Sequence, residues 1–211
     1  MATESAPTKR MLTPRGRATR ERIVAVAAEL MLEHGVAGTG VDDVQAAAHV
    51  SASQLYHYFG DKRNLVRAVV DYQNDFVLAQ QEPLLSSLDS MEALRAWRDL
   101  LVAAAEETGC RGGCAIGTLS GELAEAHPDC REALADGYRR WESAIRSGLR
   151  KMQERGELRR GADPDRLALA LLTAVQGGAT IAQVRRDTEP LKAGIDTVLE
   201  HIESLRPRRR G

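Results

Sequence analysis

The chain has 211 residues, of which 43% are hydrophobic, 28% charged and 4% aromatic, and its net charge at pH 7 is −1. This length is typical of one or two domains, and the hydrophobic content is sufficient for a folded core. The balanced charge excludes a polycation that binds nucleic acid along its whole length, and three cysteines, an odd number, favour a reducing cytoplasm over a disulfide framework.

Basic residues are nevertheless concentrated near the N-terminus. Residues 8–22 contain six basic side chains and one acidic one, a local net charge of +5. We predict a flexible basic arm over residues 1–18, because two prolines and Gly16 disfavour regular structure there. Such an arm, which includes Arg17, suits the phosphate backbone or a minor groove of DNA. The alternative is a solvated tail without a binding role, as we expect for residues 207–211.

Two predicted helices follow this arm. Thr19 can cap a helix that ends at Gly35 and whose apolar residues recur at the i, i+4, i+7, i+8 spacing of one buried face. Thr39 with Asp42 is a second capping signal, for a short helix that ends near Ala48. The longer helix can therefore brace the shorter one.

Residues 51–60 predict another short helix with its own start and stop. Ser51 and Gln54 have the capping-box spacing, and Gly60 ends the helix after about two turns. A helix this short is not stable alone in water, so neighbours must hold it while it presents side chains. Two short helices across a tight turn, braced by a longer one, form a helix-turn-helix.

The segments TRERI, VDDVQAAA and LYHYFGDK carry these signals, and in order and spacing they resemble the DNA-binding domain of the TetR family of bacterial transcriptional regulators. The resemblance covers residues 19–66. His49 stands where the family usually has glycine, at a turn position that often needs φ > 0. The resemblance implies that Tyr56 and Lys62 contact DNA phosphates.

Other side chains of this unit have roles that follow from their chemistry. Gln54 could read adenine through a bidentate amide contact, or it could serve only as a cap. Leu55 and Phe59 are expected to be core residues that anchor the helix. The predicted DNA-binding residues are Arg17, Thr39, Ser51, Ala52, Ser53, Gln54, Tyr56, His57, Tyr58 and Lys62.

The rest of the chain is predicted to be helical, without β-alternation or internal repeats. Asp61 and Ser90 mark two of the helix starts. We therefore expect an all-α fold of about nine helices, with a three-helix helix-turn-helix domain at residues 19–66 and a ligand-binding and dimerisation domain at residues 67–206. The most apolar segment, residues 167–184, is too polar for a membrane span, and its nearly all-round apolar surface suggests a partner subunit.

The segments GGCAIGTL, GELA, WE and RRD, spread over residues 110–200, resemble the LmrA/YxaF-like subgroup of the TetR family, although Ala115 stands where the subgroup usually has proline. The resemblance implies a homodimer joined through helices at about 164–186 and 190–205, and a small-molecule pocket among the middle helices. We expect an apolar, flat or aromatic effector with one or two polar anchors. The candidate pocket residues, each of which could instead be ordinary core, are Tyr72, Phe76, Trp97, Leu101, Cys114, Ile116, Leu119, Tyr138, Trp141 and Gln176.

The cysteines allow a different interpretation. Cys110 and Cys114 are separated by three residues in a glycine-rich loop, where oxidation could lock the loop and alter DNA binding. The alternative is a buried apolar Cys114 beside an incidental Cys110. A site with His127 and Cys130 matches no standard zinc pattern, and we expect neither a metal nor a cofactor.

These observations predict a ligand-responsive DNA-binding regulator of the cytoplasm, most simply a repressor released from a palindromic operator by its effector. The sequence contains no phosphate-binding loop, nucleophile elbow or paired His–carboxylate arrangement, so we expect no enzyme. A helical thiol enzyme using Cys110 and Cys114 would lack the usual C-x₂-C spacing. A ligand carrier that has lost DNA binding is a third class, and salt-dependent affinity for a palindrome would distinguish the regulator from both.

Overall fold

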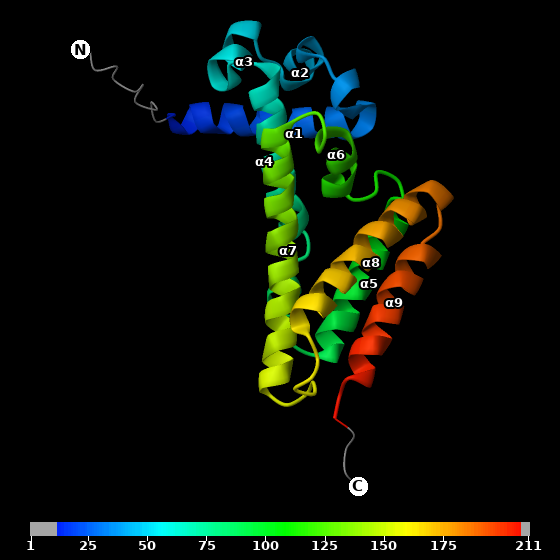
Figure 1. Cartoon of the computed structure of the whole chain (residues 1–211). Coiled ribbons are helices and arrows are strands. Elements are labelled where there is room, and N and C mark those ends of the chain that lie inside the picture. Colours follow the sequence, from blue (N-terminus) through cyan, green and yellow to red (C-terminus); the bar gives the residue numbers. More distant parts are fainter. Residues whose placement is uncertain (1–11, 208–211) are drawn as a thin grey trace, which may run out of the picture.

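The computed structural model describes residues 12–207, which form nine α-helices and one short 3₁₀ helix without a β-strand (Figure 1). The all-α prediction is thereby confirmed. The predicted arm before residue 12 and the tail after residue 207 lie outside the described residues. In chain order the helices are α1 (Pro14–Gly38), α2 (Val41–Ala48), α3 (Ala52–Phe59), α4 (Lys62–Ala79), α5 (Met91–Glu107), α6 (Ala115–Leu123), α7 (Pro128–Glu154), α8 (Pro164–Arg185) and α9 (Glu189–Ser204), with the 3₁₀ helix at Leu85–Ser87.

The helices form two groups (Figure 1). α1, α2 and α3 lie together at one end, and α4 leaves them to run alongside α7. α8 and α9 form a hairpin that packs on α5 and α7, while α6 contacts α1, α4 and α7. The first turn of α4 belongs to the helix-turn-helix and its later turns to the larger group, so the domain boundary predicted at residue 66 falls inside one continuous helix.

α1 starts earlier than predicted. Thr13, not Thr19, is the N-cap, because its Oγ1 accepts a backbone amide hydrogen bond at 3.1 Å, and Pro14 occupies the first helical position. Proline is favoured there because its φ is preset and it has no amide that needs a partner. The prediction of a flexible arm is therefore wrong for residues 14–18, which include Arg17.

α2 also starts differently. The predicted capping pair Thr39 and Asp42 is wrong, since the N-cap is Gly40, whose amide donates to Asp43 Oδ2 at 2.7 Å. Thr39 is only 1% exposed and donates to the carbonyl of Gly35 at 2.8 Å. Gly35 interrupts α1 with a φ of 77°, at the residue where the sequence predicts a stop, but one further helical turn follows it.

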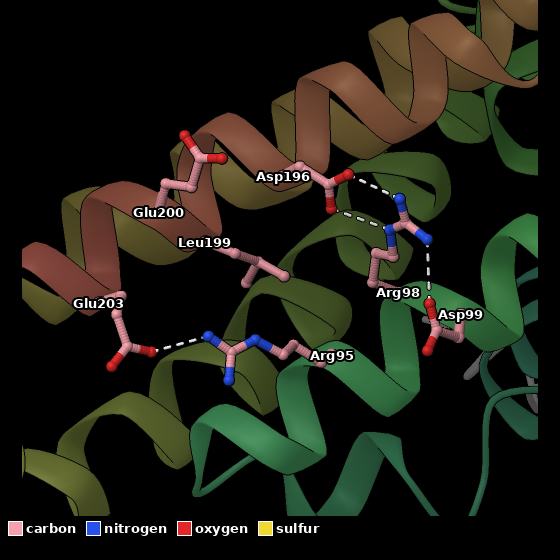
Figure 2. A pocket seen from close by; sticks show the side chains of 7 residues that line it. All are labelled: Arg95, Arg98, Asp99, Asp196, Leu199, Glu200 and Glu203. Carbon is pink, nitrogen blue, oxygen red and sulfur yellow. Dashed lines mark hydrogen bonds and ion pairs between the residues drawn. The ribbon is translucent and has the colours of Figure 1, made fainter.

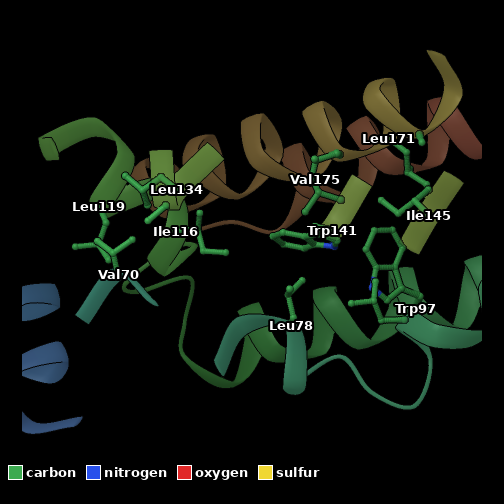
Figure 3. Close-up of a cluster of buried hydrophobic side chains, with 14 of the residues drawn as sticks. Val70, Leu78, Trp97, Ile116, Leu119, Leu134, Trp141, Ile145, Leu171 and Val175 are labelled. Atoms are coloured by element: carbon green, nitrogen blue, oxygen red, sulfur yellow. The ribbon is translucent and has the colours of Figure 1, made fainter. Parts of the chain in front are cut away.

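Each group has a buried apolar interior. α3 is anchored by Leu55 and Phe59, which are 0% and 5% exposed, as expected from the sequence. In the larger group Trp97 and Trp141 are buried among aliphatic side chains from several helices (Figure 3). The two interiors form one continuous hydrophobic cluster. α3 therefore packs on the same core as the C-terminal helices.

Candidate nucleic-acid interface and effector region

The helix α3 is held at both ends by residues of its own sequence. The Gln54 amide donates to Ser51 Oγ at 3.2 Å, and the Ser51 amide donates to Gln54 Oε1 at 3.0 Å, which completes the predicted capping box. Gly60 ends the helix with a φ of 77°. This two-turn helix therefore presents a row of exposed residues, namely Ser51, Ala52, Ser53, Gln54, Tyr56 and His57.

His49 occupies the positive-φ position of the turn between α2 and α3. Its φ and ψ are both 51°, and its amide donates to the carbonyl of Ala46 at 3.3 Å. The expectation of a positive φ at this position is confirmed. Because such a conformation costs a non-glycine residue about 1–2 kcal/mol, the turn keeps its geometry at the expense of stability.

Basic side chains of α1 contact other parts of the helix-turn-helix. Arg22 Nε donates to the carbonyl that ends α2 at 3.2 Å, and the guanidinium of Arg20 lies 5.2 Å from the centre of the Phe59 ring, a cation–π contact. Arg17 Nη1 donates to the carbonyl of residue 12 at 2.9 Å. Sequence reasoning missed the bracing roles of Arg20 and Arg22, because their partners lie on other helices.

Three predicted DNA contacts lie away from the exposed row. Tyr58 is half-buried beside the first turn of α1. Thr39 is in the core, where its hydroxyl is engaged by a backbone carbonyl. Lys62 is half-buried in the first turn of α4, directly after the Asp61 cap that accepts the Asn64 amide at 2.8 Å. A DNA contact by any of the three stays a prediction.

Four of the ten predicted pocket residues are fully buried, and the others are half-buried or exposed. Phe76, 45% exposed, stacks on half-buried Tyr72 with 5.9 Å between the ring centres, and Leu101 is also half-buried. The four candidates that fill the interior, each at most 1% exposed, are Trp97, Ile116, Leu119 and Trp141.

Three other predicted pocket residues converge on Gly117 of α6. A Cβ atom on this glycine would lie 2.9 Å from Gln176 Oε1, 3.7 Å from Cys114 Cβ and 4.0 Å from Tyr138 Oη. Gln176 Nε2 lies 3.4 Å from Cys114 Sγ, and Ser120 Oγ lies 3.3 Å from Tyr138 Oη. We call these five half-buried residues the Gly117 cluster. Burial raises the pKa of Tyr138, so the cluster offers a neutral phenol together with a hydroxyl, an amide and a thiol.

Buried polar atoms without a partner lie elsewhere in the larger group. Within residues 12–207, Gln73 Oε1, Asn74 Oδ1 and Trp141 Nε1 make no hydrogen bond. Such atoms are normally paired. Asn74 is partly satisfied, because its Nδ2 donates to the Ala133 carbonyl at 2.8 Å. Gln73, which the sequence did not indicate, and Trp141 thus hold unused hydrogen-bonding capacity.

Two surface pockets are lined mainly by charged side chains. The first, of about 470 Å³, lies between α5 and α9, where Arg98 makes two hydrogen bonds to the Asp196 carboxylate at 2.9 and 2.6 Å and Arg95 reaches Glu203 at 2.9 Å (Figure 2). The second lies between α4 and α7. None of the ten predicted pocket residues lines either one, so neither corresponds to the predicted apolar effector site.

The three cysteines are free thiols, with Cys110 and Cys130 buried and Cys114 half-buried. Burial raises the pKa of the Cys130 thiol, which keeps it protonated near neutral pH. Cys110 has a positive φ of 56°, and its carbonyl accepts from Arg186 Nη1 at 2.9 Å. In the described part of the chain, no three His, Cys, Asp or Glu side chains are grouped so that they could hold a metal ion.

Two family profiles match the chain, one in each helical group. The profile described as bacterial regulatory proteins, tetR family, matches residues 23–69, and that of the tetracyclin repressor-like C-terminal domain matches residues 90–198. Transcriptional regulator AcuR of Cereibacter sphaeroides is 29% identical over 86% of this chain and 84% of its own length. The HTH-type transcriptional repressor DhaR of Mycobacterium sp. strain GP1 is 30% identical over 87% of this chain and 91% of its own length.

Solved structures agree with these relatives. The crystal structure of a TetR transcriptional regulator from Chloroflexus aurantiacus superposes with a TM-score of 0.77 at 29% identity, covering 90% of this chain and 96% of that one. LmrA of Bacillus subtilis, which gives the predicted subgroup its name, is 25% identical over 63% of this chain. Because both matching profiles belong to a family of transcriptional regulators, the chain is a regulator and not an enzyme. The chain belongs to the TetR family of bacterial transcriptional regulators, which bind operator DNA as homodimers and respond to small molecules.

Proposed function

We propose that this protein is a homodimeric repressor that places α3 of each protomer in successive major grooves of a palindromic operator, about one DNA turn apart. The observation that carries the proposal is the construction of α3, whose outer residues are exposed while Leu55 and Phe59 fix it to the core. A two-turn helix presented in this way suits the width of the major groove. The DNA-binding unit then comprises residues 13–66, and the ligand-binding and dimerisation domain residues 67–206.

Individual contacts are proposed for two residues of the exposed row and for Lys62 at the start of α4. Tyr56 and Lys62 are proposed to bind phosphates, and Gln54 to read a base pair. Oε1 of Gln54 already accepts the Ser51 amide, so a bidentate contact with adenine would share this oxygen while Nε2 donates to the base. The oxygen has two lone pairs, so it can accept both hydrogen bonds when the Ser51 hydroxyl, 3.3 Å away, directs its own hydrogen elsewhere. Capping and reading are therefore compatible roles of one side chain.

The dimer contact is proposed at α8 and α9. Among residues 12–207, α8 is the one helix that is long and apolar enough to cross a membrane by length and composition alone. Its inner side packs against α7 and α9, whereas Leu169, Ile181 and Val184 are 54%, 50% and 80% exposed. We assign this apolar side to a second protomer rather than to lipid, because an operator-binding protein acts where DNA is, in the cytoplasm.

The effector is proposed to anchor its polar end on the Gly117 cluster, through Tyr138 and Gln176, with an apolar or aromatic body. Because most of the predicted apolar wall is packed core, binding requires neighbouring side chains to move. The effector then favours a form whose two reading helices are wrongly spaced. It can shift the balance only by its differential affinity for the two forms, typically ~1–3 kcal/mol of coupling.

A thiol response at Cys110 and Cys114 is the second candidate. The observation that favours it is the placement of the two free thiols at the ends of one glycine-rich loop, with Cys114 only half-buried. Cys110 is buried, so a disulfide between the two residues would require the loop at residues 110–113 to open. Loss of operator binding on oxidation, reversed by a reductant, would support this candidate.

Selection from random-sequence duplexes tests the proposed function. We expect the purified full-length protein to enrich a palindrome and to bind it as a dimer, with an affinity that falls steeply as salt increases. A protein that binds no duplex at low ionic strength, without effector, would contradict the proposal.

A further inference from the structure

The break in α1 is tied to α6 by a single carboxylate. Gly35 has a non-helical backbone, with φ 77° and ψ 160°, and a last helical turn follows it. At the start of that turn the amide of Val36 donates to Glu122 Oε2 of α6 at 2.7 Å. The two residues are 86 positions apart in the chain. A side chain of the larger helical group therefore caps the last turn of α1, the first helix of the proposed DNA-binding unit.

The geometry of the break leaves little freedom on either side. A Cβ atom on Gly35 would lie 3.3 Å from Glu122 Oε2, and the positive φ already disfavours any other residue. The Gly35 carbonyl accepts from Thr39 Oγ1 at 2.8 Å, inside the core. Two backbone groups at the break are therefore hydrogen-bonded. The Gly35 carbonyl is paired with Thr39 of the DNA-binding unit, and the Val36 amide is paired with Glu122 of α6.

This turn determines how α2 and α3 are oriented relative to α1. Only Thr39 and Gly40 separate the end of α1 at Gly38 from the start of α2 at Val41, and the turn at His49 then leads into α3. The ion pair between Arg63 at the start of α4 and Asp129 of α7 joins two side chains that are 57% and 59% exposed. Exposed ion pairs contribute little, whereas a carboxylate that accepts a backbone amide makes a charge-assisted hydrogen bond to a group without rotamer freedom.

We propose that Glu122 is a positioning residue for DNA reading, which sets the spacing between the two α3 helices of the dimer by holding the turn after Gly35. The same helix carries Gly117 five residues earlier, about 7.5 Å along the helix axis. A shift of α6 at the Gly117 cluster is therefore transmitted to the turn through Glu122. This link to the effector rests on the proposed function.

Operator spacing provides the test. Full-length protein is measured on duplexes that carry the half-sites selected by the wild type, with their separation changed one base pair at a time, and on a duplex with one half-site. We expect Glu122→Ala to lower affinity at the preferred spacing about tenfold and to flatten the spacing profile, with binding to the single half-site retained. Glu122→Gln keeps an acceptor oxygen and should restore most of the preference.

Glu125→Ala is the matched control, because it removes an exposed negative charge just beyond the end of the same helix. Loss of any carboxylate reduces the repulsion between protein and DNA phosphates, and Glu125→Ala measures how much affinity increases for that reason alone. Gly35→Ala disturbs the same turn from the α1 side and should reproduce the flattened profile. In hydrogen exchange the Val36 amide should exchange about tenfold faster in Glu122→Ala than in Glu125→Ala.

The outcomes separate this inference from the proposed function. If the wild type selects no palindrome, both fall. If the wild type selects one and Glu122→Ala has the spacing profile of Glu125→Ala, or an unchanged exchange rate at Val36, only the role of Glu122 is refuted.

Discussion

The two functional regions of this protein are built in opposite ways. At α3 the polar side chains are exposed, and the helix rests on two buried anchors. In the Gly117 cluster the polar groups come from α6, α7, α8 and the preceding residue Cys114, and they are half-buried against one another. The first region can meet DNA without changing its core, whereas the second must open to admit a ligand. The proposed DNA-reading surface is therefore preformed, and the proposed effector site is latent.

Removing an anchor of α3 should have the largest effect. Leu55 is fully buried, so Leu55→Ala should cost about 2–5 kcal/mol of folding free energy in the DNA-binding unit and abolish operator binding. Both tryptophans, Trp97 and Trp141, lie in the larger group, so fluorescence can follow that group separately while circular dichroism follows total helix. Ser53→Ala, on the exposed side of the same helix, is the control for folding stability only, because Ser53 is itself a predicted DNA contact. Wild-type binding by Leu55→Ala would show that α3 is not held as described.

Two substitutions test whether Gln54 both caps α3 and reads a base pair. Gln54→Ala should change the preference at one base pair per half-site by about 1–3 kcal/mol if the reading contact exists. Gln54→Glu keeps the acceptor oxygen for the Ser51 amide, so it separates capping from reading. Competition binding against all four base pairs at each position measures the change. An unaltered preference in both variants would leave Gln54 as a cap only.

Phosphate contacts should act on all sequences alike. Tyr56→Ala and Lys62→Ala should each weaken binding to the operator and to random duplexes by similar factors, about tenfold or less. Lys62→Ala should also reduce the slope of log affinity against log salt by about 1. Titrations at several salt concentrations provide the measurement. A loss confined to the operator would instead assign these residues to base reading.

The latent site can be probed without knowing its ligand. Gly117→Ala places a Cβ atom 2.9 Å from Gln176 Oε1, so Gln176 must move away from Cys114. We expect iodoacetamide to modify Cys114 about two- to tenfold faster in this variant. Gly121→Ala is a control on the same helix, because its Cβ atom would have no neighbour within 4 Å. Equal alkylation rates in the two variants, followed by mass spectrometry, would argue against the cluster as described.

The smallest effect is expected at the start of α8. A hydrogen bond from Arg150, followed by the charges of Arg150 and Arg146, lowers the pKa of Asp165. A lowered folded-state pKa stabilises the protein above the unfolded pKa of about 3.9, and this stabilisation is lost as the pH falls through the folded value. Arg150→Ala should therefore lower the urea midpoint slightly at pH 7 and leave it unchanged near pH 2. An equal difference at both pH values would exclude the ion pair as its cause.

Signals that act within a few residues could be predicted from the sequence. The capping box of Ser51 and Gln54, the cap at Asp61 and the stop at Gly60 all join groups three or four positions apart, and the structure confirms them. The predicted start of α1 failed for a local reason as well. The prediction treats Pro14 as a helix breaker, but proline at the first helical position favours the helix.

The sequence by itself determined the all-α class, the order of the helices and the position of the short helix that we propose reads DNA, because backbone hydrogen bonds and apolar periodicity are local properties. Only the tertiary structure decided that Thr39 is core, that Glu122 caps the break in α1, and that Cys114, Tyr138 and Gln176 meet at Gly117. These contacts join side chains across different helices, and helix packing, which one sequence does not reveal, sets which residues face each other.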